Sequence, residues 1–399
     1  MIPQDFVKIM SASLGEERAE RVIASLDSAP EVSVRVNPFK MSLSALREYF
    51  GDIAGDPVPW AEGEAFYLKE RVSFTLDPLF HAGAYYVQEA SSMYVGALLE
   101  KIFERMGRRD SFRVLDLCAA PGGKTTQLLS HLMSVEKGNP RNNSLVANEV
   151  MASRVAVLAE NVAKWGCGGA TVTNSDPSHF KGESFDIMVV DAPCSGEGMF
   201  RKDEKARENW SLNNVSLCAS RQKRILTDIW DSLVDGGHLI YSTCTFNRYE
   251  DEDIVEWICS SLGAKCIEMR HFYPGEDRGE GFFAALMVKQ GGGEECISSR
   301  KGHKGSSRNL SGLKVFESQF PMADEALSVN LPEGKYPTVE LDRDSALRFL
   351  ARETLSFKEQ PTGYLLLTYK GLGLGFVKNL GNRANNLHPM PRRILSLKR

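Results

Sequence analysis

The chain has 399 residues, of which 42% are hydrophobic and 25% charged, and its formal net charge at neutral pH is −4. These values are typical of a globular protein with two or three domains, and they exclude a uniformly basic coat while leaving room for a local basic face. The eight cysteines form no CxxC pair and the histidines complete no zinc pattern, so we expect no metal site. No secretory signal and no apolar run long enough to span a membrane are present, which predicts a cytoplasmic protein with free thiols.

The first 75 residues alternate helical and extended patterns. The segment "GEERAERVIASL" at 15–26 predicts a helix, and "VSVRVNP" at 32–38 predicts a strand that ends at Pro38. We therefore expect an N-terminal α+β unit over residues 1–75. An aromatic-rich run at 80–103 then leads into a further helix.

Strands and helices alternate regularly over residues 76–290. Strands are expected at 112–119, 144–150, 170–176, 185–192 and 238–244. Helices are expected at 123–133, 151–165, 211–234 and 248–262, with Gly166 ending the second and Asn247 capping the last. This alternation predicts an α/β domain built on a parallel sheet with helices on both faces.

The last quarter of the chain begins with a break in the pattern. Residues 291–312 are rich in glycine, serine and lysine, and we interpret them as a linker. A smaller α+β unit is expected over 313–399. Its end, Phe376 to Arg399, carries six Lys or Arg and no acid. Such an end is either a solvated surface tail or a segment that contacts phosphates.

The stretch "LDLCAAPGGKTTQ" at 115–127 joins the first strand of the α/β domain to its first helix through small residues. Such loops let backbone N–H groups and a helix N-terminus approach a ligand. A P-loop is excluded because Cys118 occupies a required glycine position and Pro121 removes a backbone donor. The GxGxxG pattern of nicotinamide-binding proteins is absent as well.

Carboxylates follow three successive strands of this domain, and they suit S-adenosylmethionine. Asp116 follows the first strand, Glu149 the second and Asp176 the third. In an open parallel sheet these strand ends border one crevice. We expect Asp116 at the amino-acid end of the cofactor, Glu149 at the ribose hydroxyls and Asp176 near the adenine.

Two later strands each end in a cysteine. "VVDAPCSGEG" places Asp191 and Cys194 after the fourth strand, and "YSTCTF" places Cys244 after the fifth. Both strand ends open onto the substrate side of the same crevice. Two thiols beside a methyl donor indicate covalent activation of a weak carbon nucleophile such as C5 of a pyrimidine.

In that chemistry one thiolate adds to C6, C5 then takes the methyl group, and loss of the C5 proton expels the thiol. Asp191 could act as an acid at the ring nitrogen N3, and Lys124 could lower the pKa of the attacking thiol. The chemistry alone leaves open which of the two cysteines attacks.

The motifs together resemble those of a known family. "DLCAAPGGKT", "ANE", "NSD", "DAPCSGEG" and "YSTCT" match, in order and spacing, the NOL1/NOP2/Sun family of RNA 5-methylcytosine methyltransferases. "RVNP" at 35–38 and "YYVQEASS" at 85–92 are similar to the upstream motifs of that family. The end "GLGLGFVKNLGNRANNLHPMPRR" resembles the PUA-like RNA-binding region of bacterial members that modify small-subunit ribosomal RNA.

The resemblance implies a Rossmann-like S-adenosylmethionine-dependent core between an N-terminal α+β RNA-binding unit and a C-terminal PUA-like α+β unit. It also implies that Cys244 is the nucleophile, that Cys194 assists product release, and that Lys124 and Asp191 line the active site. Two departures, "KWG" at 164–166 and an insert-like stretch at 134–144, touch none of these groups. The implied cofactor-binding set is Asp116, Cys118, Ala119, Ala120, Pro121, Gly122, Gly123, Lys124, Glu149, Arg154, Asp176 and Asp191.

The implied substrate is RNA, with 16S ribosomal RNA or the 30S subunit first and tRNA second, and with the chain acting as a monomer. The target base must leave its stack to reach such a site. Two other functions stay open. An amino-group methyltransferase would explain "DAPC" but not Cys244, and a non-catalytic assembly factor would not need the catalytic groups that are all present.

Overall fold

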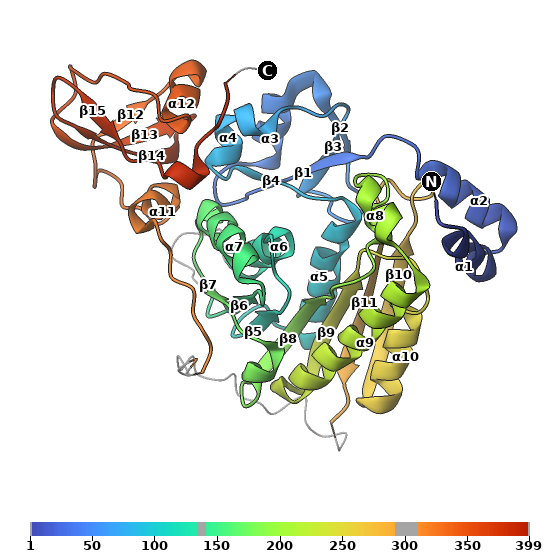
Figure 1. Ribbon diagram of the computed structural model, residues 1–399. Coiled ribbons are helices and arrows are strands. Elements are labelled where there is room, and N and C mark those ends of the chain that lie inside the picture. The colour runs from blue at the N-terminus through green and yellow to red at the C-terminus, as the bar shows by residue number, and fades with distance from the viewer. Residues whose placement is uncertain (1, 134–140, 292–309, 311, 398–399) are drawn as a thin grey trace.

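The computed structural model describes residues 2–133, 141–291, 310 and 312–397. The predicted linker therefore lies outside the described residues except for 291, 310 and 312, as do residues 134–140 of the insert. Figure 1 shows a large sheet with its helices, an N-terminal unit above it, and a C-terminal unit beside the N-terminal one.

The helices are α1 (Gln4–Leu14), α2 (Glu16–Ser25), α3 (Leu43–Phe50), α4 (Pro78–His81), α5 (Tyr94–Met106), α6 (Gly123–Leu132), α7 (Ala152–Trp165), α8 (Glu204–Asn209), α9 (Leu212–Ile229), α10 (Glu252–Ser261), α11 (Pro321–Leu327) and α12 (Arg343–Leu350). The strands are β1 (Val32–Val36), β2 (Ala54–Pro57), β3 (Ala65–Leu68), β4 (Tyr85–Val87), β5 (Arg113–Asp116), β6 (Ser144–Asn148), β7 (Ala170–Thr173), β8 (Phe185–Asp191), β9 (Leu233–Thr243), β10 (Ala264–Phe272), β11 (Phe282–Lys289), β12 (Thr338–Glu340), β13 (Gly363–Tyr369), β14 (Leu372–Asn379) and β15 (Ala384–Asn386). A membrane-crossing helix would need more length and more apolar character than any helix of the described residues has.

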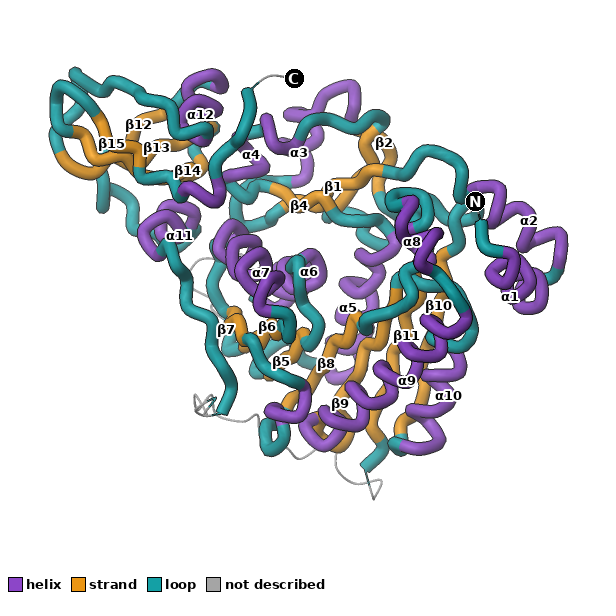
Figure 2. Tube along the Cα trace, in the orientation of Figure 1, coloured by secondary structure: helices purple, strands orange, loops and turns teal. Residues whose placement is uncertain are grey.

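The large sheet has the strand order β10-β11-β9-β8-β5-β6-β7, and β5 to β9 run parallel. Strand β11 is antiparallel to both of its neighbours. Helices α9 and α10 pack on one face, and α5 and α6 on the other (Figure 2), so the inner strands are buried on both sides. The predicted parallel sheet is confirmed. Strands β6 and β7 lie on one side of β5, and β8 lies on the other. At such a reversal of strand order the loops after β5 and β8 run in opposite directions, so a crevice opens between them.

Two predicted boundaries in this domain are wrong. The helix expected over 211–234 ends at Ile229, and β9 already begins at Leu233. Strand β9 runs on through Gly236 because an irregularity in its pairing with β8 accommodates that stretch. The helix expected from 248 begins at Glu252, since Asn247 caps the preceding turn instead: its Oδ1 accepts the Glu250 N–H at 3.0 Å.

The N-terminal sheet, of order β2-β3-β1-β4, reaches past residue 75, because β4 pairs with β1. Side chains of the "RVNP" motif join this unit to the α/β domain. The Asn37 amide donates to the carbonyl oxygens of Gly83 and Trp165 at 2.8 and 2.9 Å. The guanidinium of Arg35 also crosses the boundary and lies 4.6 Å from the centre of the Trp165 ring system. The upstream motif therefore acts as a structural junction.

Helices α1 and α2 form a hairpin that lies away from the N-terminal sheet (Figure 1). Its apolar face packs on the loops that follow β8 and β9. The Phe6 ring lies 5.2 Å from Phe200, 5.6 Å from Trp210 and 5.7 Å from Phe246, measured between ring centroids. The hairpin thus supports the two loops that carry the predicted catalytic cysteines.

The C-terminal unit has a sheet of order β12-β13-β14-β15 and shares a hydrophobic core with the N-terminal sheet. Within its basic end, Arg392 is only 10% exposed and pairs with Asp324 at 2.6 Å and with Glu160 of α7 at 3.7 Å. This residue therefore holds the unit in place and is not a free phosphate contact. Lys398 and Arg399 lie outside the described residues.

A histidine on α6 bridges two acids where the N-terminal unit meets the α/β domain. His131 Nδ1 lies 2.7 Å from Glu100 Oε1, and His131 Nε2 forms an ion pair at 3.0 Å with Glu64 Oε1 of the N-terminal unit. Burial by itself would lower the pKa of His131, but the two carboxylates raise it to about 9. Burial by itself would raise the pKa of Glu100, but hydrogen bonds and charges from His131 and Arg109 lower it to about 2.

We therefore expect the stability of the protein to fall in alkaline solution. The His131 pKa is raised in the folded state, so its contribution is complete below about pH 6.5 and is lost as pH rises through about 9. The loss should reach up to about 3 kcal/mol. Urea unfolding between pH 6 and pH 10, compared for the wild type and His131→Gln, measures it. Equal pH dependence in the two proteins would contradict the assignment.

Candidate active site

The two predicted thiols meet at the crevice. Cys194, on the loop after β8, has its Sγ 3.2 Å from the Sγ of Cys244, on the loop after β9. The hydrogen bond with Cys244 and burial raise the pKa of the Cys194 thiol well above its usual value, and Glu250 and Asp191 add to this. Cys194 therefore keeps its proton, and its sulfur lies in hydrogen-bond contact with that of Cys244.

Lys124 and Asp191 form an ion pair beside these thiols. Lys124 Nζ lies 2.8 Å from Asp191 Oδ2, and Ser242 donates to the other carboxylate oxygen at 2.7 Å. Burial would lower the pKa of Lys124, but Asp191 raises it, and the charge of Cys244 contributes in the same direction. Lys124 therefore stays an ammonium ion beside the two thiols.

The carboxylate of Asp116, at the end of β5, lacks a full set of partners. It is completely buried, and its Oδ2 accepts the Thr125 hydroxyl at 2.6 Å. Its Oδ1 has no hydrogen-bond partner among the described residues. Burial raises the pKa of Asp116 to about 7, and the charge of Asp191 adds to the effect. A buried, unsatisfied carboxylate oxygen suits a cationic donor such as the ammonium group of S-adenosylmethionine.

The glycine loop after Asp116 is pinned from α7 through its carbonyl oxygens. Arg154 donates to the carbonyl of Ala120 at 2.6 Å, and Asn161 to that of Pro121 at 2.8 Å. Gly122 has a φ of 110°, and a Cβ there would lie 3.3 Å from a Leu158 methyl, so only glycine fits without strain.

Three further residues of the predicted set lie on the same loop. The Ala119 N–H donates to the Asn148 carbonyl at 2.8 Å, which joins the loop to β6. A Cβ on Gly123 would lie 3.3 Å from the Tyr86 ring, so this backbone lies close to the N-terminal unit. Burial raises the pKa of the Cys118 thiol, which is therefore neutral.

The other two predicted acids differ in what they do. Glu149 is 3% exposed; it accepts the Met151 N–H at 2.8 Å and lies 3.3 Å from Arg154 Nη1. Asp176 accepts the N–H and the hydroxyl of Ser178, which lowers its pKa, so its carboxylate caps the short helix Pro177–Phe180. The charge of Glu149 helps to raise the pKa of Asp116, whereas Asp176 binds Ser178 of its own loop through Oδ1.

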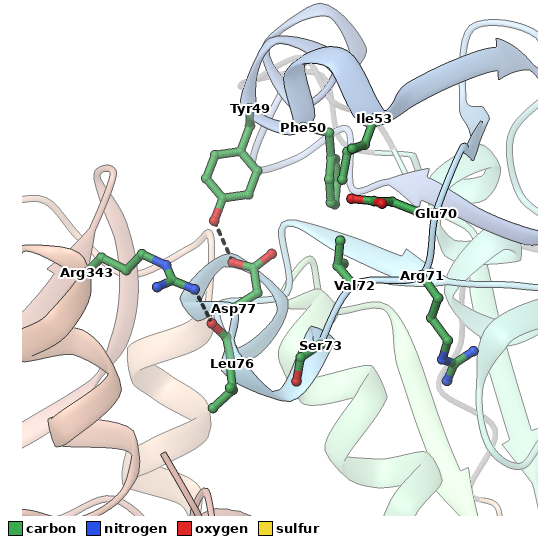
Figure 3. A pocket seen from close by; sticks show the side chains of 10 residues that line it. All are labelled: Tyr49, Phe50, Ile53, Glu70, Arg71, Val72, Ser73, Leu76, Asp77 and Arg343. Atoms are coloured by element: carbon green, nitrogen blue, oxygen red, sulfur yellow. Dashed lines mark hydrogen bonds between the residues drawn. The ribbon is translucent and has the colours of Figure 1, made fainter. Parts of the chain in front are cut away.

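A separate cavity of about 600 Å³ lies at the junction of the N-terminal and C-terminal units (Figure 3). Tyr49 donates to Asp77 at 2.8 Å in its wall, and Arg343 donates to the carbonyl of Leu76 at 2.9 Å. None of the predicted site residues lines it.

An acidic group lies behind the Cys244 loop. Asp251, Glu252 and His271 each offer one ligand atom within 4.8 Å of the others, so they could hold a cation. His271 Nε2 lies 3.0 Å from Glu252 Oε1, and its Nδ1 lies 3.8 Å from Asp251 Oδ2.

Sequence reasoning missed several buried polar groups around the site. Glu197 lies within the quoted "DAPCSGEG", and Glu250 is one of the acids after "YSTCT", but neither received a role. Both are fully buried and hydrogen-bonded. Gln88 of "YYVQEASS" accepts from Arg35 at 2.8 Å, which joins the two upstream motifs. The signal that could have found these residues is their place inside the motifs.

Comparison with known proteins supports this arrangement along the chain. The model of the 16S rRNA methyltransferase RsmB/F family matches residues 106–288. The model of the N-terminal domain of 16S rRNA methyltransferase RsmF matches residues 2–90, and that of the methyltransferase RsmF PUA domain matches 336–394. The predicted Rossmann-like methyltransferase core and the PUA-like C-terminal unit are confirmed.

Curated relatives and solved structures agree. The chain is 29% identical to Ribosomal RNA small subunit methyltransferase F of Shewanella piezotolerans over 97% of this chain and 96% of that protein. It is 30% identical to the protein of the same name from Shewanella baltica over 83% and 72% of the two chains.

Among solved structures, NSun6 from Pyrococcus horikoshii with SFG has a TM-score of 0.63 at 19% identity, covering 72% of this chain and 98% of that one. A methyltransferase homolog protein from Pyrococcus horikoshii has a TM-score of 0.57 at 26% identity, covering 69% and 91%. Three consecutive family models and full-length relatives thus point to one conclusion. The chain belongs to the RsmB/F family of 16S rRNA methyltransferases and is an enzyme that uses S-adenosylmethionine as its methyl donor.

Proposed function

We propose that this enzyme methylates C5 of a cytosine in 16S ribosomal RNA, with Cys244 as the nucleophile and Cys194 as the residue that assists product release. The observation that carries the proposal is the 3.2 Å contact between the two thiols beside the Lys124–Asp191 pair. An amino-group methyltransferase would need neither thiol. The names of the relatives favour 16S ribosomal RNA as the substrate.

The first step is addition of the Cys244 thiolate to C6 of the cytosine. The S–C6 bond forms, and the electron pair of the C5–C6 double bond is delocalised over C5 and N3. The Lys124–Asp191 pair lies beside the thiols and is proposed to place a proton at N3, which neutralises the developing charge. Bound S-adenosylmethionine supplies the electrophilic methyl group that C5 accepts.

Release requires removal of the C5 proton, return of the N3 proton to the Lys124–Asp191 pair, and cleavage of the S–C6 bond, which returns an electron pair to Cys244. The hydrogen bond with Cys244 is the largest cause of the raised pKa of Cys194. Once the Cys244 sulfur is bonded to C6, that cause is gone, whereas burial and the charges of Glu250 and Asp191 still raise the pKa of Cys194. Cys194 is proposed to assist release from its place beside the Cys244 sulfur.

The residues that hold the cofactor are proposed from the same geometry. The unsatisfied oxygen of Asp116 would accept from the ammonium group, Glu149 from the ribose hydroxyls, and the backbone of residues 118–123 would border the amino-acid end. A role for Asp176 at the adenine would use its Oδ2, because both contacts with Ser178 are made by Oδ1.

Replacing Glu149 with glutamine is expected to weaken S-adenosylmethionine binding by about 10- to 100-fold. The reason is that both ribose hydroxyls are proposed to donate to the carboxylate, and glutamine replaces one of its two acceptor oxygens with an NH₂ donor. Isothermal titration calorimetry measures the change, with Glu104→Gln on the exposed side of α5 as the control. Unchanged affinity in Glu149→Gln would contradict the ribose role.

The substrate is tested with labelled S-adenosylmethionine and three RNAs: 30S subunits, protein-free 16S RNA and bulk tRNA. The expected result is label in 16S RNA that digestion identifies as 5-methylcytosine. Label confined to tRNA would keep the chemistry and change the substrate, and label on an exocyclic nitrogen would overturn the proposal. We further propose that the enzyme is a monomer and acts in the cytoplasm. Sedimentation of the pure protein would test the first of these two statements, because it measures the oligomeric state.

A further inference from the structure

Two buried glutamates cross between the loops that carry the thiols. We define the first cysteine loop as residues 191–200 and the second as residues 243–251. Glu197 of the first loop accepts the Phe246 N–H of the second at 3.0 Å and the Asn247 amide at 2.9 Å. Glu250 of the second loop accepts the N–H of Ser195, next to Cys194, at 3.0 Å and also its hydroxyl. Each loop therefore supplies the carboxylate that holds the other.

Other contacts confine the same two loops. The Gly198 N–H donates to the carbonyl oxygen of Cys244 itself at 2.8 Å. A Cβ on Gly198 would lie 2.9 Å from that oxygen and 2.3 Å from the Gly281 carbonyl oxygen, so only glycine permits this approach. The Asn247 amide lies 2.9 Å from both Glu197 and Glu250, so it joins the two carboxylates.

The carboxylates are surrounded by donors and not by cations. Trp210 donates to Glu197, and Gln222 donates to Glu250, each at 2.9 Å. Neither glutamate has an ion pair within the part of the chain that the structure describes. Burying a carboxylate without a counter-ion is costly, and burial accordingly raises the pKa of both glutamates.

We infer that Glu197 and Glu250 are positioning residues that set the separation of the two thiols, Glu197 through the loop of the nucleophile and Glu250 through the loop of the releasing thiol. The inference rests on the proposed roles of Cys244 and Cys194. It makes the two glutamates functionally different, although their surroundings are alike. A shift in Cys244 impairs attack, and a shift in Cys194 impairs release.

Glutamine is the informative substitution at both positions. Both oxygens of each carboxylate accept from N–H or O–H donors, so one end of an amide would face a donor in either orientation. The volume is unchanged, so the loops must move apart to relieve the contact. A misplacement of about 1 Å costs about a hundredfold in rate.

The experiment follows the covalent protein–RNA adduct on denaturing gels, with 16S RNA as the substrate. Glu250→Gln is expected to accumulate the adduct as Cys194→Ala does, with turnover reduced about a hundredfold. In the Cys194→Ala background, adding Glu197→Gln should slow adduct formation by a similar factor. Glu280→Gln is the control in both backgrounds, because Glu280 is a buried carboxylate that pairs with Arg201 and does not join the two cysteine loops.

The outcomes separate the inference from the proposed function. If Cys194→Ala alone gives no adduct, the proposed thiol roles fail before either glutamate is tested. If Cys194→Ala gives an adduct that Glu197→Gln forms at the same rate, or if Glu250→Gln turns over without accumulating it, the inference is overturned. Equal loss of attack and release in both variants, in proportion to a lowered melting temperature, would show a merely structural role and also overturn it.

Discussion

Cys244→Ala is expected to lose methyl transfer by about 10⁴-fold or more, because the thiol proposed to form the bond to C6 is then missing. Cys194→Ala should instead complete one round of methylation and remain attached to the RNA, since the thiol 3.2 Å from Cys244 is then missing at the release step. Transfer of labelled methyl groups and the retained adduct on a denaturing gel measure the two effects. Both variants should bind S-adenosylmethionine as the wild type does.

Cys259→Ala on α10 is the control for this pair, because it is another free cysteine that takes no part in the contact between the thiols. If Cys244→Ala stayed active and Cys194→Ala lost all transfer, the assignment of nucleophile and releasing group would be reversed. If both variants stayed active, covalent catalysis itself would be wrong.

Arg35→Leu is expected to lower the free energy of unfolding by about 3–5 kcal/mol, since the change leaves several buried acceptors without a donor. The Arg35 side chain is completely enclosed and donates to Gln88 at 2.8 Å, to Thr126 at 2.7 Å and to the Gly123 carbonyl at 3.2 Å. Burial lowers the pKa of Arg35 to about 10, so it stays charged at neutral pH. Denaturant unfolding followed by circular dichroism measures the loss.

Arg71→Leu, on the exposed wall of the cavity at the N-terminal junction, should change stability by about 0.5 kcal/mol at most. Because Gly123 begins α6 beside the cofactor loop, Arg35→Leu should also weaken S-adenosylmethionine binding. A loss of stability below about 1 kcal/mol would mean that the junction does not depend on this guanidinium.

The parts of the fold that the sequence predicts are those set by local patterns. Apolar strands that end at or next to Asp116, Asp191 and Cys244 alternate with helices, and this pattern predicts a parallel sheet. In a parallel sheet the carboxyl ends of the strands lie along one edge, so the acids and thiols are expected there. The start of α10 was misplaced because Asn247 is a good cap in sequence, whereas in the folded chain its Oδ1 accepts the Glu250 N–H and caps the turn that precedes α10.

Local sequence patterns do not predict the contacts between segments that lie far apart in the chain. The two glutamates of the cysteine loops lie about fifty residues apart, and nothing in the spacing shows that each binds the backbone of the other loop. Likewise the pattern of α1 and α2 predicts amphipathic helices but not the surface that they cover. The basic end of the chain was read by composition, which cannot tell that Arg392 is already paired within the protein.

The hairpin of α1 and α2 has a practical consequence for handling this enzyme. Because Phe6 contacts Phe200 and Phe246, an affinity tag or fusion partner joined to the N-terminus would sit beside the catalytic loops and could perturb their kinetics. The C-terminal end of the described chain lies near α12 and α4, on the far side of the N-terminal unit (Figure 1). Immobilisation and labelling should therefore use that end.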